Sequence, residues 1–398
     1  MTLKVTVKYH HMQFHPTKSL DNGHVAGGIF MDLSSAFDCL PHDLLVSKLR
    51  AYGLSDSACS LIGSYISNRK QRVKINTTKS EWMSITKGVP QGSILGPLLF
   101  NVFVNDLFMF IDKCRLYNYA DDNSLVYDAM DVISLMECLK HDAHNAIKWF
   151  DSNGMKVNPD KFQLMILSPR DQLPDLTLCL SDNVTLKSQR NIKLLGINID
   201  DRLTFSDHVS TSCKKSARQL NALARLSKYI DTRSKRILFN SFVKSNFTFS
   251  PLSWHFCGKA NAMKMEKIQE RALRIIYKDY ESTYEDLIAL GNTNTLLETR
   301  LKLLLLEVFK CVKGVNVPFL NRLFEVKDIP YSMRDSYKLV QPKRKSVKYG
   351  IRAISYLGDK LWNDLPPEYK HIVNMDVGQF KAILIFGKSN NLDHAHYV

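Results

Sequence analysis

The hydrophobic pattern of the chain changes near residues 200–210. Before this point, short apolar runs typical of strands alternate with runs of helical spacing, whereas only helical spacing recurs after it. A change of this kind predicts more than one domain, and 398 residues are enough to form two or three. We therefore expect an α+β unit followed by a mostly helical unit.

Two short strands with a polar turn mark the first part of the chain. An apolar run that ends at Asp32 predicts a buried strand, and residues 116–127 read as a β-hairpin around a turn at residues 121–124. Asn153-Gly154 is typical of a left-handed helix end. Helices are expected at residues 44–52, 61–66, 98–107 and 133–150, and a last strand at residues 162–167.

The second part reads as a series of helices with weaker signals beyond residue 326. Ser282 and Glu285 have the spacing of a capping box, which predicts that a helix begins there. Trp362 and Phe380 are expected to be packed anchors of the C-terminal segment. Further helices are expected at residues 217–224, 237–242, 268–276 and 297–312.

Positive charge is concentrated in the second half. Residues 1–198 carry 21 basic and 19 acidic residues, whereas residues 199–398 carry 33 and 20. This asymmetry favours a catalytic or packing unit followed by a surface that binds a polyanion. The alternative is a basic surface that binds nothing.

Cysteine spacing and hydropathy limit the class of protein. The eight cysteines include no Cys-x-x-Cys pair, which argues against a zinc finger and favours reduced thiols. The longest aliphatic run, Leu303–Leu306, is far too short to cross a membrane, and the N-terminus has no apolar signal core. We expect an intracellular protein of the nucleus or cytoplasm that is not secreted and binds no membrane.

Three aspartates are candidates for metal binding. Asp32 ends an apolar strand, and Asp121 and Asp122 lie at the hairpin turn. Each alone is more often turn or cap chemistry. Together the three aspartates favour a metal site. An unpaired carboxylate beside apolar sequence is costly, and converging carboxylates repel one another unless cations neutralise them. Mg²⁺ prefers oxygen ligands, and two such ions suit phosphoryl transfer.

An ordered series of segments surrounds these aspartates and continues beyond them. The segments are Phe30-Met-Asp-Leu-Ser-Ser-Ala-Phe-Asp38, Gly88-Val-Pro-Gln-Gly-Ser-Ile-Leu-Gly-Pro-Leu-Leu-Phe100, Tyr119-Ala-Asp-Asp122, Trp149-Phe-Asp-Ser-Asn-Gly-Met-Lys-Val-Asn-Pro-Asp-Lys161, Lys193-Leu-Leu-Gly-Ile-Asn-Ile-Asp200, Gln269-Glu-Arg-Ala-Leu-Arg274 and Trp362-Asn-Asp-Leu-Pro366. Together they resemble the reverse transcriptases of non-LTR retrotransposons of the jockey type or a related clade. The resemblance covers most of the chain, from about residue 20 to the end, and the ordered series of motifs is highly specific.

The resemblance implies a right-hand polymerase palm, an antiparallel sheet with helices on one face, followed by a mostly helical thumb. It places the palm with a remnant of the fingers in residues 1–200, a basic thumb-like region in 201–325 and a C-terminal extension in 326–398. The implied reaction is RNA-directed DNA synthesis, with an RNA template, a DNA primer and a dNTP as partners. The implied cofactor is a pair of Mg²⁺ ions, with Mn²⁺ as an alternative.

Residue roles also follow from the resemblance. Asp32 and Asp121 would be the principal metal ligands and Asp122 a supporting one, with a further contact from the backbone of Leu33. Lys161 would stand near the leaving pyrophosphate as a proton donor or charge stabiliser; the alternative is an ordinary exposed lysine. The Leu194–Ile199 hairpin would be the primer grip.

Three more residues would form the nucleotide pocket. Phe37 would be the steric gate that excludes a 2′-hydroxyl, although a core aromatic is the simpler interpretation of the sequence alone. Gln91 would contact the incoming nucleotide or the template. Gly92 would allow a close approach of the backbone.

The N-terminus departs from the family pattern. Only 31 residues precede Asp32, fewer than the family's fingers segment, and its endonuclease is absent. We therefore expect an N-terminally truncated polymerase that by itself synthesises DNA weakly or not at all. Two alternatives are a catalytically dead remnant that at most binds nucleic acid, and a pseudogene product without function.

Overall fold

The computed structural model describes residues 16–33, 36–155, 157–170, 173–181, 184–327, 338–351, 353–366 and 375–386. The chain divides into two compact units. One unit is Gly23–Arg190, and the other joins Met1–Asn22 to Asn191–Val398. The described part is a mixture of helices and strands, as the alternating sequence pattern predicted.

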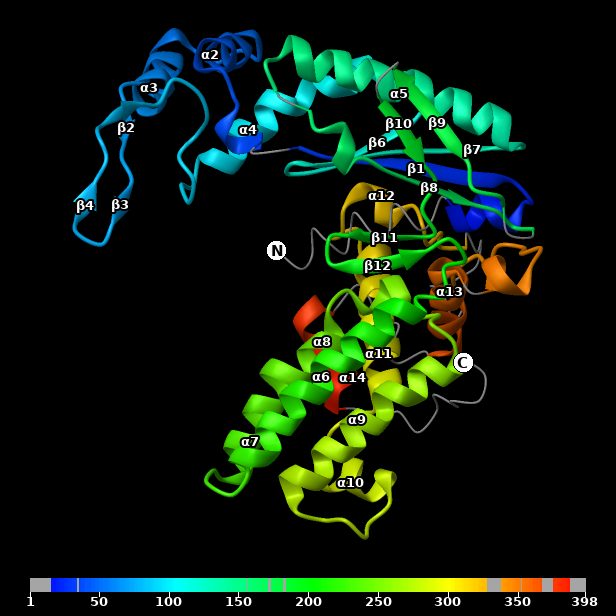
Figure 1. Cartoon of the computed structure of the whole chain (residues 1–398). Coiled ribbons are helices and arrows are strands. Elements are labelled where there is room, and N and C mark those ends of the chain that lie inside the picture. The colour runs from blue at the N-terminus through cyan, green and yellow to red at the C-terminus, as the bar shows by residue number, and fades with distance from the viewer. Residues whose placement is uncertain are drawn as a thin grey trace. The chain divides into compact units, whose positions relative to one another are not determined.

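A four-stranded antiparallel sheet forms the centre of the Gly23–Arg190 unit (Figure 1). Its strand order is β6-β7-β1-β8, so the predicted strand ending at Asp32 is confirmed and lies inside the sheet. Ile29 of β1 is fully buried and has Leu125 and Leu164 as neighbours on the flanking strands. The strands are β1 (Val25–Asp32), β6 (Arg115–Tyr119), β7 (Asp122–Ala129) and β8 (Gln163–Leu167).

Two glycines allow β1 to lie tightly between its neighbours. A Cβ atom on Gly28 would stand 2.9 Å from the Leu125 carbonyl oxygen, and one on Gly27 would stand 3.0 Å from that of Met165. Both distances are shorter than normal contacts, so side chains here would push the sheet apart. The glycine pair thus fixes the position of the strand that carries Asp32.

Helix α5 (Val132–Ser152) packs along β1 and β7. Asp131 caps its first turn by accepting a hydrogen bond from the Ser134 backbone N–H at 2.8 Å. The helix ends at Asn153, and Gly154 follows with a φ of 66°, which confirms the predicted left-handed end. Its buried face is apolar apart from one aspartate and comprises Leu135, Leu139, Asp142, Ala143, Ala146, Trp149 and Phe150.

Shorter elements complete this unit. The helix expected at residues 98–107 is α4 only to Val104, where a 3₁₀ segment takes over. These elements are η1 (Ala36–Asp38), α2 (His42–Ala51), α3 (Asp56–Ile66), α4 (Gly96–Val104), η2 (Asn105–Phe110), η3 (Pro159–Lys161), β2 (Lys70–Gln71), β3 (Lys74–Ile75), β4 (Thr78–Lys79), β5 (Met83–Ser84), β9 (Thr177–Ser181) and β10 (Val184–Lys187).

The other unit is mostly helical. It opens with the hairpin expected around residues 194–199, whose turn has positive φ values at Leu195 and Gly196. Its elements are β11 (Asn191–Leu194), β12 (Ile197–Asp200), α6 (Ser206–Leu226), α7 (Thr232–Leu238), η4 (Phe239–Lys244), α8 (Ser245–Thr248), η5 (Pro251–Trp254), α9 (Lys259–Tyr277), α10 (Tyr284–Leu290), α11 (Leu296–Val312), α12 (Pro318–Asn321), η6 (Val347–Ile351), α13 (Ile354–Asp364) and α14 (Val377–Phe386).

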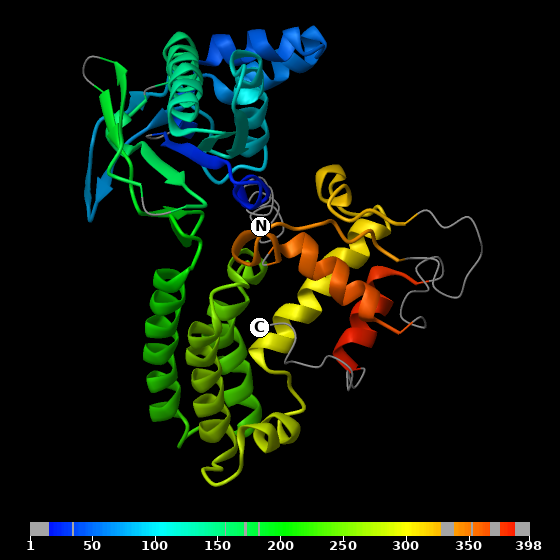
Figure 2. The same ribbon diagram turned by 90° about the vertical axis from the view of Figure 1, so that its right-hand side faces the viewer.

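Helices α13 and α14 pack against α11 (Figure 2). Trp362 and Phe380 are fully buried there, so both are confirmed as anchors. Phe380 stacks on Phe309 with ring centroids 4.2 Å apart. A separate apolar cluster joins α6, η4 and α9 through Leu220, Val243 and Ala272 among others.

The cap of α10 corrects one prediction. Its capping box pairs Thr283 with Asp286, one residue beyond the expected Ser282 and Glu285. Ser282 instead donates its hydroxyl to Asp279 at 2.5 Å. Two adjacent hydroxyl residues can both start a helix, and the local turn at Asp279 decides between them.

The N-terminal residues of the helical unit are tied to its C-terminal segment. Asp21 accepts hydrogen bonds from the backbone N–H groups of Lys345 and Ser346 and from the Ser346 hydroxyl. This buried carboxylate explains why residues before Gly23 belong with the helical unit. Among the residues that the structure describes, no helix is long and apolar enough to cross a membrane.

Candidate active site

Two of the predicted aspartates are cross-strand neighbours. Asp32 is the last residue of β1, and its register partner on β7 is Asp122. Residues directly opposite in an antiparallel pair project to the same face, with Cβ atoms about 4.5–5.5 Å apart. The sheet therefore places these two carboxylates side by side, and both residues are partly exposed.

Asp121 lies in the hairpin turn next to this pair. The turn consists of Ala120 and Asp121, because Tyr119 pairs with Asp122. It is thus shorter than the expected turn at residues 121–124, and Asp122 belongs to the strand. Ala120 has a φ of 52°, and Asn123 donates its side-chain N–H to the Asp121 carbonyl at 3.0 Å. Two-residue hairpin turns need positive φ and therefore favour Asn, Asp and Gly pairs, so the sequence Ala-Asp does not predict such a turn.

Lys161 stands beside Asp32. Its Nζ lies 3.4 Å from Asp32 Oδ2, with both side chains about half exposed. An isolated bridge between Leu33 and Val157 brings the chain just before Lys161 to the end of β1. Asn158 then caps the short η3 turn by accepting from the Asp160 backbone N–H at 3.2 Å. The exposed lysine of the simpler interpretation therefore does have a specific acidic neighbour.

The loop before α4 docks onto the segment that follows β1. The Val89 N–H donates to the Phe37 carbonyl at 2.9 Å, and the Gly88 N–H donates to the Leu40 carbonyl at 2.8 Å. His42 of α2 and Arg69, which follows α3, in turn hold the Gly88 carbonyl at 2.8 and 2.7 Å. Two hydrogen bonds thus tie this loop to residues 37–40, and two more hold it from His42 and Arg69.

Phe37 and Gln91 take up defined positions in this loop contact. The Phe37 ring is partly buried and stacks on Phe100, with centroids 4.5 Å apart and an interplanar angle of 29°. Gln91 is exposed and donates its side-chain N–H to both Asp38 carboxylate oxygens at 2.9 Å. Gly92 has a φ of 77° and open space around its Cβ position.

The donor chemistry of Asp32, Asp121 and Asp122 suits a hard cation. All offer carboxylate oxygens, the ligands that Mg²⁺ prefers. Their ligand atoms are nevertheless not all within 4.8 Å of one another. Across the described residues, the group that meets this criterion is Asp112, His141 and Asp142.

The Asp112–His141–Asp142 group has a structural explanation at its centre. Asp142 is fully buried and accepts hydrogen bonds from the backbone N–H groups of Asp112, Lys113 and Cys114. It thereby holds the segment that leads into β6. The burial of Cys114 beside this carboxylate raises the pKa of its thiol. Sequence analysis missed Asp142, although an aspartate between Leu139 and Ala143 on an apolar helix face was a signal for a buried acceptor.

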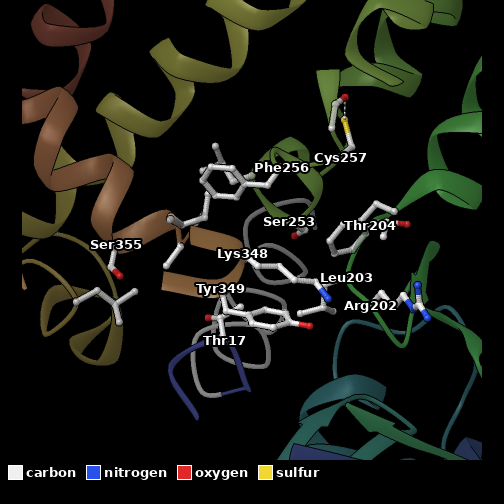
Figure 3. A pocket seen from close by; sticks show the side chains of 16 residues that line it. Thr17, Arg202, Leu203, Thr204, Ser253, Phe256, Cys257, Lys348, Tyr349 and Ser355 are labelled. Carbon is white, nitrogen blue, oxygen red and sulfur yellow. Dashed lines mark hydrogen bonds between the residues drawn. The ribbon is translucent and has the colours of Figure 1, made fainter. Parts of the chain in front are cut away.

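The helical unit contains a cavity of about 240 Å³ (Figure 3). Apolar side chains such as Leu252 and Phe256 line it, together with two cationic residues, Arg202 and Lys348. The Lys348 Nζ lies 4.8 Å from the centre of the Tyr349 ring. None of the predicted site residues lines this cavity.

Comparisons with known proteins give the chain its family. The family described as reverse transcriptase (RNA-dependent DNA polymerase) matches residues 2–199. In Drosophila melanogaster, the chain is 29% identical to the probable RNA-directed DNA polymerase from transposon BS over 282 residues, and 25% identical to the RNA-directed DNA polymerase from mobile element jockey over 273 residues. These alignments cover 67% and 65% of this chain.

The chain spans only 30% and 29% of the lengths of these two relatives. Among solved structures, it is similar to telomerase from Candida albicans, with a TM-score of 0.37 at 14% identity over 74% of this chain and 58% of that one. The match over residues 2–199, together with the relatives from BS and jockey, shows that the chain belongs to the reverse transcriptase family, in the branch found in non-LTR retrotransposons.

Proposed function

We propose that the chain is an RNA-directed DNA polymerase that joins a dNTP to the 3′-hydroxyl of a primer paired with an RNA template. The observation that carries this proposal is the register pair of Asp32 and Asp122, with Asp121 adjacent in the turn and Lys161 within 3.4 Å of Asp32. The names of the relatives from BS and jockey describe the same activity in those proteins.

The aspartates would hold the divalent cations of the reaction. Asp32 and Asp121 would be the principal ligands and Asp122 a supporting one. Bound Mg²⁺ would supply charge stabilisation at the attacking and leaving oxygens. The chain's own contribution is the fixed position of the carboxylates, because Asp32 ends β1 and Asp122 begins β7, two hydrogen-bonded strands whose register the buried sheet sets.

Three further residues would position the nucleotide. Lys161 would neutralise the leaving pyrophosphate and donate a proton to it. Phe37, held by Phe100 and by the hydrogen bond from Val89 to its carbonyl, would block a ribose 2′-hydroxyl. Gln91 would reach the nucleotide or the template from the same loop, with Gly92 leaving space for them.

The two units would share the polymerase function. The sheet and α5 of Gly23–Arg190 would be the palm, and the helices of the other unit would form the thumb that holds the template–primer duplex. Residues 199–398 carry a net charge of +13, which suits phosphate contacts. The β11–β12 hairpin would be the primer grip.

Primer extension tests the proposal directly. The purified chain is incubated with an rA–dT template–primer, dTTP and Mg²⁺, and incorporation is compared among Asp32→Asn, Asp121→Asn and Asp151→Asn variants. Asp151 is an exposed residue near the end of α5 and serves as the matched control. Incorporation should fall at least about a hundredfold in the first two variants and persist in the control.

Two results would contradict the proposal. Incorporation that survives Asp32→Asn and Asp121→Asn would place the reaction elsewhere. No incorporation by a folded chain that still binds the template–primer would favour the nucleic-acid-binding alternative, to which the basic second half also points.

A further inference from the structure

Residues 70–84 form an exposed two-stranded arm of the Gly23–Arg190 unit (Figure 1). Lys70 pairs with Ser84 near its base and Lys74 pairs with Lys79 near its tip, where Asn76 has a φ of 53°. Every residue from 70 to 84 is exposed. No side chain of the arm therefore belongs to the buried core of the unit, and the composition of the arm needs another explanation.

One face of the arm is basic and carries a tryptophan. Lys70 of β2, Arg72 of the short link and Lys74 of β3 stand at alternate positions of one extended segment, the spacing of a shared face, and Lys79 is the register partner of Lys74. Trp82 lies on this face too, because the Arg72 guanidinium carbon stands 4.5 Å from its ring centre. We name Lys70, Arg72, Lys74, Lys79 and Trp82 the basic face.

The opposite face differs in chemistry. It carries Gln71, Val73 and Ile75, with Met83 as the register partner of Gln71. Val73, Ile75 and Met83 are between 63% and 70% exposed. The arm is thus two-sided, with the cations and the indole together on one side.

The charge of the arm stands out from that of its unit. Residues 23–190 contain 17 basic and 18 acidic residues, a net charge of −1. Residues 70–84 contain four basic residues and one acidic residue, Glu81, so the rest of the unit has a net charge of −4. A cationic arm on an otherwise acidic unit is complementary to a polyanion.

The exposed tryptophan narrows the choice of polyanion. Trp82 is 56% exposed, although a large aromatic side chain is normally buried. Indole and guanidinium planes both stack on unpaired bases, whereas the bases of a duplex already stack on one another. Lysines flanking such a pair contact the phosphates between bases.

We propose that the basic face of this arm binds single-stranded nucleic acid, with Trp82 and Arg72 stacking on an unpaired base and Lys70, Lys74 and Lys79 contacting phosphates. The inference builds on the proposed function only in that the ligand is a strand of the same chemical class. Binding by the arm requires neither the aspartates nor turnover.

Titration of the full chain with labelled oligonucleotides tests the proposal. Affinity for single-stranded RNA, single-stranded DNA and duplex is measured between 50 and about 300 mM salt for the triple variant Lys70→Gln/Lys74→Gln/Lys79→Gln. Each lost phosphate contact on a single strand lowers the slope of log K against log salt by about 0.7, so the slope should fall by about 2. The matched control removes three exposed lysines elsewhere in the same unit, Lys113→Gln/Lys140→Gln/Lys148→Gln, and should keep the slope.

Trp82→Ala separates stacking from charge. It should weaken single-stranded RNA and DNA binding about tenfold and leave binding of heparin, a polyanion without bases, unchanged. Photo-crosslinking of RNA that contains 4-thiouridine should map to residues 70–84 and should persist in Asp121→Asn. That variant loses nucleotide incorporation under the proposed function, so the two proposals fail separately.

Three outcomes would overturn the inference. One is an equal change in the slope of log K against log salt in the Lys70→Gln/Lys74→Gln/Lys79→Gln variant and in the control that lacks three lysines elsewhere. Another is a larger loss of affinity for duplex than for single strands in the Lys70→Gln/Lys74→Gln/Lys79→Gln variant, which would show that the arm prefers duplex. The third is a loss of binding in the Val73→Thr/Ile75→Thr variant while the Lys70→Gln/Lys74→Gln/Lys79→Gln variant binds fully. That result would assign the contact to the opposite face of the arm.

Discussion

At the residue scale, Lys48 joins three elements of the Gly23–Arg190 unit. Its Nζ lies 2.7 Å from Asp106 Oδ1 and 4.4 and 4.6 Å from the ring centres of Phe103 and Trp149. Burial lowers the pKa of this ammonium group, while the hydrogen bond to Asp106 opposes that shift. The side chain is only 11% exposed, so its partners have little water to replace it.

Lys48→Ala should therefore destabilise the unit by about 1–3 kcal/mol, because Asp106 and the Phe103 carbonyl lose their donor. Arg50→Ala is the matched control on the same helix. Its ion pair with Asp56 has both side chains more than half exposed, which makes a loss of about 0–1 kcal/mol the expectation. Urea unfolding measures both, and equal losses would show that the buried position of Lys48 adds nothing.

Single residues also show how far the sequence predicts the candidate site. The order and flanks of Asp32, Asp121 and Lys161 were enough to predict a role for each residue, because the motifs consist of consecutive residues; these roles stay predictions. Their pairing could not be predicted, since register depends on which strands meet: Asp122, and not Asp121, is the partner of Asp32. The hydrogen bonds from Gln91 to Asp38 likewise join residues 53 positions apart, beyond the reach of any local pattern.

At the element scale, the loop before α4 depends on two glycines that differ in one respect. Gly88 and Gly92 both have positive φ, at 81° and 77°. A Cβ atom on Gly88 would lie 2.6 Å from the Asp38 Cα, whereas nothing lies within 4 Å of one on Gly92. Backbone strain is thus common to both positions, and the steric clash belongs to Gly88 alone.

Gly88→Ala should lower the stability of the unit by about 2–4 kcal/mol, and Gly92→Ala by about 1 kcal/mol. The difference arises because the Gly88 variant must move the loop away from residues 37–40 and break its hydrogen bonds. Thermal unfolding of the two variants against the unchanged chain checks this. Equal losses would mean that left-handed strain alone governs both positions.

Elements with long periodic patterns were predictable, and their ends were not. The helix at residues 133–150 proved to be α5, since its apolar face and end signals agree. The boundary at Val104 and the cap at Thr283 were misplaced, because neighbouring residues offer equivalent start and stop signals and tertiary contacts choose among them. Nor could a local pattern show that Asp21 packs with residues 345–346, more than 320 positions away.

At the scale of the whole molecule, buried histidines should make the helical unit sensitive to acid. Burial lowers the pKa of His208 to about 4 and, together with the nearby Arg300 charge, that of His255 to about 3. The unfolded chain binds these protons near pH 6.5. As pH falls below 6.5, protons bind the unfolded state first, so the free energy of unfolding should fall by about 1.4 kcal/mol per pH unit for each histidine.

Urea unfolding between pH 7 and 4.5, followed by tryptophan fluorescence, measures this dependence. Trp254 is a suitable reporter because its ring centre lies 5.6 Å from that of His208. His208→Gln should flatten the pH dependence by the share of one histidine, and the exposed His144→Gln should leave it unchanged. An unchanged slope in His208→Gln would show that this imidazole is protonated in the folded protein.

Asp359 of α13 should give the same unit the opposite dependence over an overlapping pH range. Burial raises the pKa of its carboxyl to about 7, although the Arg344 charge acts to lower it. An unfolded aspartate ionises near pH 3.9. The folded state therefore retains a proton that the unfolded state has released, and stability is lost as pH rises from about 4 to 7.

Asp359→Asn should remove this loss, because the amide has nearly the same shape and never ionises. At pH 4 the variant should resemble the unchanged chain, whereas at pH 8 it should be more stable, by up to about 4 kcal/mol. Asp364→Asn, on the same helix but at its less buried end, is the control. Thermal melts at both pH values decide the matter: a variant that is less stable at pH 8 would show that attraction between Asp359 and Arg344 outweighs the burial of the charge.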